Sequence, residues 1–162
     1  MQICALCTAY LHIFVLSLNY TKMKSTTNII NVDIPMSLSE SEILSKLYSS
    51  NINNAYLHKI KELSSFSDNN LSEYLNISVR TLHSYMQKDT LFKTNLKEPI
   101  MYLLYLLKHG IKVFETKKEF DNWLNSENFF FDGKKPVSFL NTITGIRFID
   151  DRLTAMEYGD NV

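Results

Sequence analysis

A chain of 162 residues is long enough for one domain or two very small ones, which excludes a large multidomain enzyme. The apolar fraction of 45% and the aromatic fraction of 12% can supply a core and argue against intrinsic disorder. Seventeen basic and seventeen acidic side chains cancel, so binding to nucleic acid must come from a local face and not from the charge of the whole chain.

The first 35 residues are expected to form an N-terminal arm. Residues 3–18 contain no charge, which is typical of a signal-peptide core but short for a membrane span. No basic segment precedes this run and no clear cleavage site follows it, whereas Met23 and Lys24 begin a sequence typical of a cytosolic protein. We therefore expect residues 1–22 to be an over-extended start and the protein to be cytoplasmic, with secretion as the alternative.

Few glycines and prolines interrupt the remaining chain, which favours helices over strands. We predict an all-α protein. Ser37 and Glu40 have the spacing of a capping box, so the first helix is expected to have Ser37 as its N-cap. Apolar spacing then predicts a second helix over residues 52–64.

Pro99 is expected in the first turn of a longer helix, where its missing N–H costs little. The apolar run 100–107 within that helix is too short to span a bilayer, so it is a core helix or an oligomer interface. Thr116 is expected to cap the next helix. Pro136 is expected to begin a short helix that ends near Gly145, and a last helix is predicted over residues 146–158.

Residues 67–88 have the pattern of a helix-turn-helix, with helices over 68–75 and 79–87. Ser67 and Ser78 are suitable N-caps, and Asn76 tolerates the left-handed conformation that a tight turn requires. The second helix would present its N-terminal side chains to base edges, where Arg80 could bind guanine through two hydrogen bonds and Lys88 could contact phosphate. The same geometry also occurs as core packing in all-α proteins, so both interpretations stay open. The candidate DNA-binding residues are Ser78, Arg80, Thr81, Ser84 and Lys88.

Catalysis has little support in the sequence. The four histidines are scattered and lack the spacing of metal ligands. Asp150 and Asp151 are consecutive, so they would not face each other on a helix. Cys4 and Cys7 have no second pair with which to complete a zinc site, and we interpret them as small apolar residues. We expect a protein that is not an enzyme and that holds no metal or cofactor.

The C-terminal third alternates aromatic residues with helix breakers. Trp123 and the phenylalanines are expected to supply core area, and Gly133 and Gly145 to permit turns. Residues 129–131, three consecutive phenylalanines, are expected to lie in a loop with at least one of them anchored in the core. An exposed contact patch is the alternative.

The order of these residues resembles the toxin-binding domain of the Xre/MbcA/ParS antitoxins. The family pattern runs roughly V-F-G, then A-x-x-W-L, then P-N-x-x-L-x-G-x-x-P-L-x-L-L, followed by a T and a G. The chain departs from it at Glu115, where the family usually has Gly, and at Glu127, where it has Pro. Residues 71–82 are similar to the Xre-like helix-turn-helix of the same proteins, with Asn76 in place of the turn Gly. The matching C-terminal residues are Val113, Phe114, Phe120, Trp123, Leu124, Asn128, Gly133, Lys134, Lys135, Pro136, Val137, Phe139, Leu140, Thr142 and Gly145.

The resemblance covers about residues 38–159. After the N-terminal arm over 1–35, it implies an Xre-like helix-turn-helix domain over 36–94 and a small helical toxin-binding domain over 95–162. It implies an antitoxin that occludes the active site of a RES-domain, NAD-consuming toxin. Such antitoxins also repress their own operon by binding operator DNA, as homodimers or as larger hetero-oligomers with the toxin. A stand-alone transcriptional regulator with a C-terminal oligomerisation unit is the alternative. The residues that would face or support the toxin are Gly133, Lys134, Lys135, Pro136, Arg147, Asp150, Asp151 and Arg152.

Overall fold

The computed structural model describes residues 32–89 and 91–159, and this part of the chain contains helices and no strand. The all-α prediction is therefore confirmed. The chain divides into a unit of residues 1–31 and a unit of residues 32–162, and every described element belongs to the second. The predictions about Cys4, Cys7, the apolar run 3–18 and the start near Met23 lie outside the described residues. None of the described helices is both long and apolar enough to cross a membrane.

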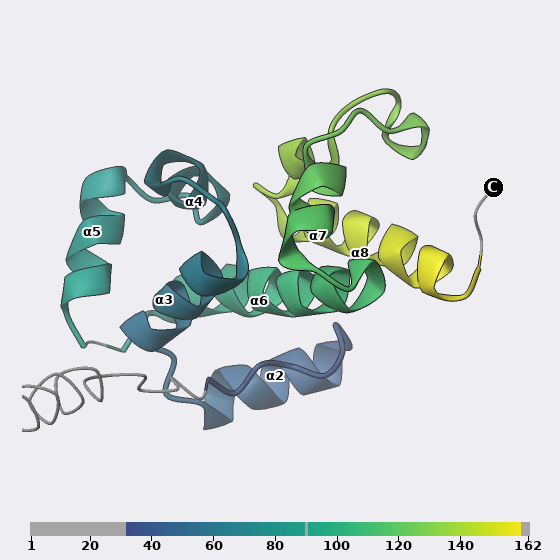
Figure 1. Ribbon diagram of the computed structural model, residues 1–162. Coiled ribbons are helices and arrows are strands. Elements are labelled where there is room, and N and C mark those ends of the chain that lie inside the picture. Colours follow the sequence, from purple (N-terminus) through teal and green to yellow (C-terminus); the bar gives the residue numbers. More distant parts are fainter. Residues whose placement is uncertain (1–31, 90, 160–162) are drawn as a thin grey trace, which may run out of the picture. The chain divides into compact units, whose positions relative to one another are not determined.

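Seven α-helices and two short 3-10 helices make up the described residues of the second unit (Figure 1). In chain order they are α2 (Glu40–Ser49), α3 (Asn54–Leu63), α4 (Asp68–Tyr74), α5 (Val79–Gln87), α6 (Thr94–Phe114), α7 (Lys117–Leu124), η1 (Phe129–Phe131), η2 (Pro136–Phe139) and α8 (Ile143–Glu157).

Helix α6 lies at the centre of this unit, and α2, α3, α7 and α8 all pack against it. Within residues 100–107, every side chain except that of Tyr105 is buried. Of the two alternatives offered for the apolar run, a core helix or an oligomer interface, the structure shows the core helix. Helix α6 therefore contacts both α3, which precedes the helix-turn-helix in the chain, and α7 and α8, which follow α6 (Figure 1).

Two predicted helix starts are wrong. Helix α2 has Ser39 as its N-cap and not Ser37, and the Ser39 side chain accepts a hydrogen bond from the Glu42 amide. Helix α6 begins at Thr94, so Pro99 lies in its second turn and not its first. The turn before Pro99 forms because tertiary packing overrides local preference: Leu96 is buried in the core.

The prediction for residues 136–158 is also corrected. The helix that begins at Pro136 ends at Phe139, and Gly145 lies in the first turn of α8. A Cβ atom on Gly145 would lie 2.0 Å from the carbonyl oxygen of Phe139. Gly145 is therefore required for close packing of two backbone segments and not for a turn.

Glu115 ends α6 in the left-handed conformation, with φ 65°. This is the position where the family pattern has Gly, so the turn keeps its geometry although the residue differs. A side chain with a Cβ atom is strained in this conformation, and Gly is not.

We expect Glu115→Gly to raise the free energy of unfolding by about 0.5–1 kcal/mol, because the strain relieved exceeds the added chain entropy of Gly. Urea denaturation measures the change. The matched control is Glu119→Gly, which places the same substitution on an exposed residue inside α7 and should lower stability by about 1 kcal/mol. Destabilisation by Glu115→Gly would show that the Glu115 side chain stabilises the fold in some other way.

Candidate functional site

The predicted helix-turn-helix is present in the structure as α4, a turn and α5. Ser67 caps α4 by accepting from the Asn70 amide, and Ser78 caps α5 by accepting from the Thr81 amide. Asn76, between them, has φ 53°, the left-handed conformation that was predicted for the turn. Leu71 and Leu82 are fully buried and fix the two helices against the core.

The five candidate DNA-binding residues lie along α5 and at its two ends. The hydroxyls of Ser78 and Thr81 are 2.8 Å apart and serve the N-cap. Arg80 and Lys88 are exposed, and Ser84 is half-buried. Within the described residues, no ion pair engages the Arg80 guanidinium. The same is true of the Lys88 ammonium, so both charged candidates are available to a partner.

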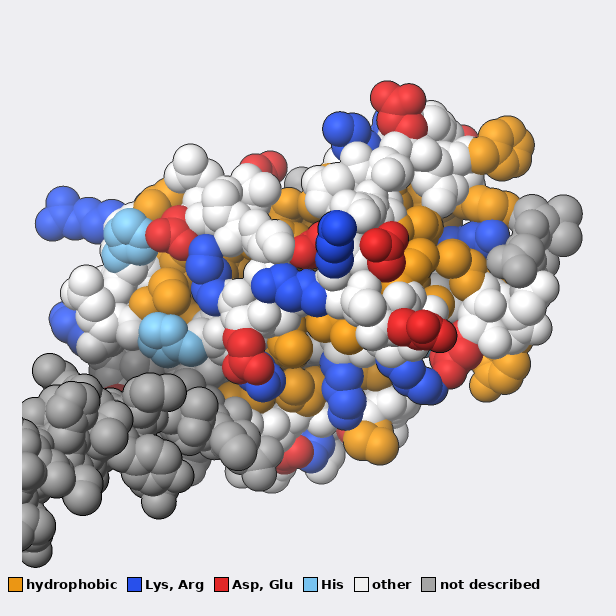
Figure 2. All heavy atoms as spheres, in the orientation of Figure 1, with side chains coloured by type: hydrophobic (Ala, Val, Ile, Leu, Met, Phe, Trp, Pro, Cys, Tyr) orange, Lys and Arg blue, Asp and Glu red, His pale blue; other side chains and the backbone are white. Residues whose placement is uncertain are grey.

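An acidic side chain, Asp68, lies close to this surface and is held by two basic groups. Its carboxylate is 2.8 Å from Lys61 Nζ and 2.8 Å from His83 Nε2. The hydrogen bond from Lys61, followed by that from His83, lowers the pKa of Asp68. The His83 contact also ties α5 to α4. Figure 2 shows basic and acidic side chains interspersed on the visible face, so no broad field of one sign surrounds the helix-turn-helix there.

The eight residues proposed to face or support the toxin do not form one surface. Gly133, Lys134 and Lys135 are exposed in the loop between η1 and η2, and Asp151 is exposed on α8. Pro136 is buried in the core. The remaining three lie on α8 and point to three different neighbours: Arg147 to α2, Asp150 to α6 and Arg152 to the aromatic loop.

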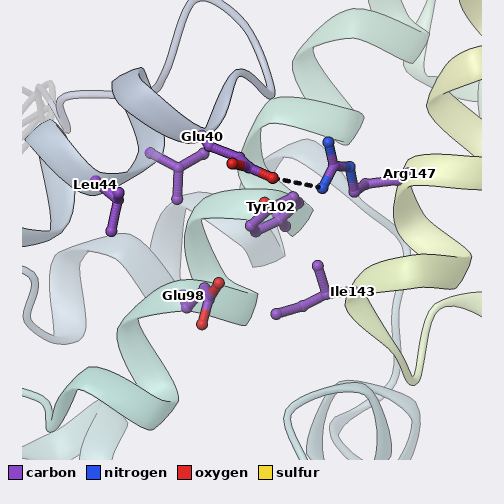
Figure 3. Close-up of a pocket in the computed structure, with 7 residues that line it drawn as sticks. Glu40, Leu44, Glu98, Tyr102, Ile143 and Arg147 are labelled. Carbon is purple, nitrogen blue, oxygen red and sulfur yellow. Dashed lines mark ion pairs between the residues drawn. The ribbon is translucent and has the colours of Figure 1, made fainter.

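Arg147 lines a cleft of about 290 Å³ between α2, α6 and α8. In Figure 3 its guanidinium points across the cleft to Glu40, and the ion pair measures 3.8 Å. Tyr102 from α6 lies beneath this pair, and burial raises the pKa of its hydroxyl. Across the described residues, no cluster of three metal-ligating side chains is arranged to hold an ion. The Arg147–Glu40 ion pair links α8 to α2 across this cleft.

Asp150 belongs to a buried ionic network that the sequence did not predict. Its carboxylate lies 2.5 Å from His109 Nδ1, and Glu157 lies 3.1 Å from His109 Nε2. Lys112 bonds to the other oxygen of Glu157. The hydrogen bond to Asp150 is the largest of the effects that raise the pKa of His109. The available signal was the seven-residue spacing of Asp150 and Glu157, which places them on one face of α8.

The loop around residues 129–131 is held by a set of bonds centred on Asn128. The Asn128 side chain accepts from the Phe130 amide, and its backbone carbonyl accepts from the amides of Phe131 and Gly133. Gly133 has φ 72°, which favours Gly at this position. Phe131 is buried while Phe129 is 90% exposed, so the expectation that at least one phenylalanine anchors the loop is confirmed.

These features define the C-terminal part as helical, with an aromatic loop that is closed by backbone and Asn128 hydrogen bonds. Residues 109–159 match the family described as the antitoxin Xre/MbcA/ParS C-terminal toxin-binding domain. The match begins inside α6, contains α7 and α8, and confirms the resemblance for this part of the chain. It supports a toxin-binding role for the C-terminal unit. No curated protein matches the chain.

Proposed function

We propose that this protein is the antitoxin of a RES-domain, NAD-consuming toxin. It binds the toxin through its C-terminal unit, occludes the toxin's active site and carries out no chemistry of its own. It also represses its own operon through α4 and α5, as a homodimer or as a larger complex with the toxin, in the cytoplasm. The observation that carries the proposal is the match of residues 109–159 to antitoxin toxin-binding domains.

The arrangement of the helices is compatible with both roles. Helix α6 contacts α3, which packs on α5, and it also contacts α7 and α8 of the matched segment. A single central helix thus connects the surface proposed for DNA with the surface proposed for the toxin. We propose that α6, which begins at the junction of the domain over 36–94 and the domain over 95–162, packs against helices of both.

Co-expression with the product of the adjacent reading frame tests the proposal. Expression of the neighbour alone should arrest growth and lower cellular NAD, and co-expression should restore both. The two proteins should also co-purify. A neighbour without toxicity would count heavily against the proposal.

The alternative is a stand-alone transcriptional regulator, and the well-formed helix-turn-helix favours it as a second candidate. In that case the C-terminal unit would serve self-association. Binding to the protein's own promoter, in the absence of any adjacent RES-type reading frame, would favour this alternative.

We expect Arg80→Ala to weaken binding to the promoter fragment by about 1–3 kcal/mol, the range of a bidentate contact to a base. Neutralisation of the toxin should remain unchanged, because Arg80 lies outside the matched segment. An electrophoretic or fluorescence titration measures the affinity, with Lys118→Ala as a control that removes an exposed cation from α7. Equal loss of both activities would contradict the proposed separation of roles.

A further inference from the structure

Three phenylalanines are exposed on the C-terminal unit, and we call them the aromatic patch: Phe129, Phe130 and Phe148. Their exposed fractions are 90%, 39% and 46%. Phe130 is 5.9 Å from Phe129, and Phe148 is 5.0 Å from the buried ring of Phe131. The patch therefore draws on two elements, because Phe129 and Phe130 lie in η1 and Phe148 lies on α8. Exposed apolar patches of this kind mark interaction sites.

The loop that carries Phe129 is already ordered without a partner. The Asn128 bonds close it from within, a bond from the Asn128 amide to the Lys134 carbonyl joins its two ends, and Phe131 anchors it in the core. Binding through Phe129 would therefore order its side chain but not the backbone of the loop, which limits the entropy cost. Aromatic side chains are common energetic centres of protein interfaces.

Arg152 adds a charged group to the patch. Its guanidinium carbon lies 3.5 Å from the centre of the Phe130 ring. In the described part of the chain it makes no ion pair, whereas Arg147 five residues earlier pairs with Glu40. A guanidinium stacked by one face on a ring keeps its planar set of donors free for a carboxylate.

We propose that the aromatic patch and Arg152 are the anchor by which this protein holds its toxin, and that the toxin offers an apolar pocket with a carboxylate at its rim. This inference rests on the proposed function and names the residues through which the toxin would be bound. The toxin is the occupant because all four residues lie within the segment matched to toxin-binding domains. Three exposed phenylalanine rings do not suit DNA, which is bound mainly through its phosphates.

The test measures the affinity of the full chain for the product of the adjacent reading frame by calorimetry or biolayer interferometry. We expect Phe129→Ala to weaken binding at least about 30-fold, the minimum for an interface hot spot. Arg152→Lys, which keeps the charge and loses the planar donors, should also weaken it. Both variants should melt like the wild type and bind the promoter fragment normally. The control is Tyr48→Ala, an aromatic residue 84% exposed on α2 and outside the matched segment, which should change nothing.

Wild-type binding that survives both Phe129→Ala and Arg152→Lys would overturn this inference and leave the proposed function intact. The inference would also be overturned if the Phe129→Ala variant formed a smaller species than the wild type in light scattering and bound the toxin with unchanged affinity. That result would mean that a second copy of the chain, and not the toxin, covers the patch. A wild-type chain that does not bind the neighbour would instead refute the proposed function itself.

Discussion

Replacing Asp150 with alanine is expected to lower the free energy of unfolding by about 3 kcal/mol at pH 6, the cost of removing one partner of a buried ion pair. Both ring nitrogens of His109 face carboxylates, and only the protonated ring can donate to both. Without Asp150 the buried imidazolium would keep only the longer bond to Glu157. Chemical denaturation at fixed pH measures the loss.

The chain provides a matched control in the next residue. Asp151→Ala removes the same charge from the same helix, but Asp151 is exposed and has no ion pair within the described residues. Its effect should stay within about 0.5 kcal/mol. The double variant His109→Leu with Asp150→Leu should be less destabilised than Asp150→Ala, because neither partner is then left charged and buried. Equal effects at positions 150 and 151 would show that the network contributes no stability.

The difference between wild type and Asp150→Ala should depend on pH in a defined direction. The folded state raises the pKa of His109, so the stabilisation is fully present below the ordinary histidine pKa of about 6.5. It is lost as the pH rises through the raised pKa, because the ring gives up the proton that binds Asp150. The pKa of Tyr105, which packs 5.6 Å from the imidazole, is raised by burial to about 12, so this tyrosine stays neutral through the same range.

Local signals in the sequence predict the helix-turn-helix well. Ser67, Asn76 and Ser78 act within three residues of their own positions, so their roles in caps and turn follow from residue type. The family pattern likewise predicted the C-terminal part, and its Gly position, which is Glu115 in this chain, has the left-handed conformation in the structure. Local signals do not always decide, because the capping-box spacing at Ser37 gave the wrong start for α2, whose N-cap is Ser39.

Features that depend on residues far apart were not predictable in the same way. The contact between His109 and Asp150 joins residues 41 positions apart on two helices, and neither residue has a local partner that would reveal it. The early start of α6 depends on burial of Leu96 against the core. Likewise, the eight proposed toxin-binding residues are close in sequence, but α8 directs Arg147, Asp150 and Arg152 to separate neighbours.

Gly145→Ala is expected to destabilise the protein by about 3 kcal/mol, at the upper end of the range for inserting a methyl group into a packed site. The new Cβ would lie 2.0 Å from the Phe139 carbonyl oxygen and 2.9 Å from the Thr142 hydroxyl oxygen. The Thr142 hydroxyl caps α8 by accepting from the Gly145 amide. Relief of the clash would therefore require movement of backbone and of the cap together. Thermal or urea unfolding measures the effect, and Thr144→Ala, an exposed change in the same turn, should be nearly neutral.

Comparison with Gly110→Ala shows that the loss of stability depends on which atom lies nearest to the added Cβ. There the added Cβ would lie 2.2 Å from the ring of Phe120, so relief of the clash requires a buried side chain to repack and not the backbone to move. At Gly145 the nearest atom is a carbonyl oxygen of η2, so the whole connection between η2 and α8 must move. That connection also sets how Phe139 and Phe148 pack, with ring centres 5.9 Å apart, beside the aromatic patch. Gly145→Ala should therefore weaken toxin binding as well as stability, whereas Gly110→Ala should reduce stability alone. Weaker toxin binding by Gly110→Ala, with unchanged binding by Gly145→Ala, would contradict the placement of the patch.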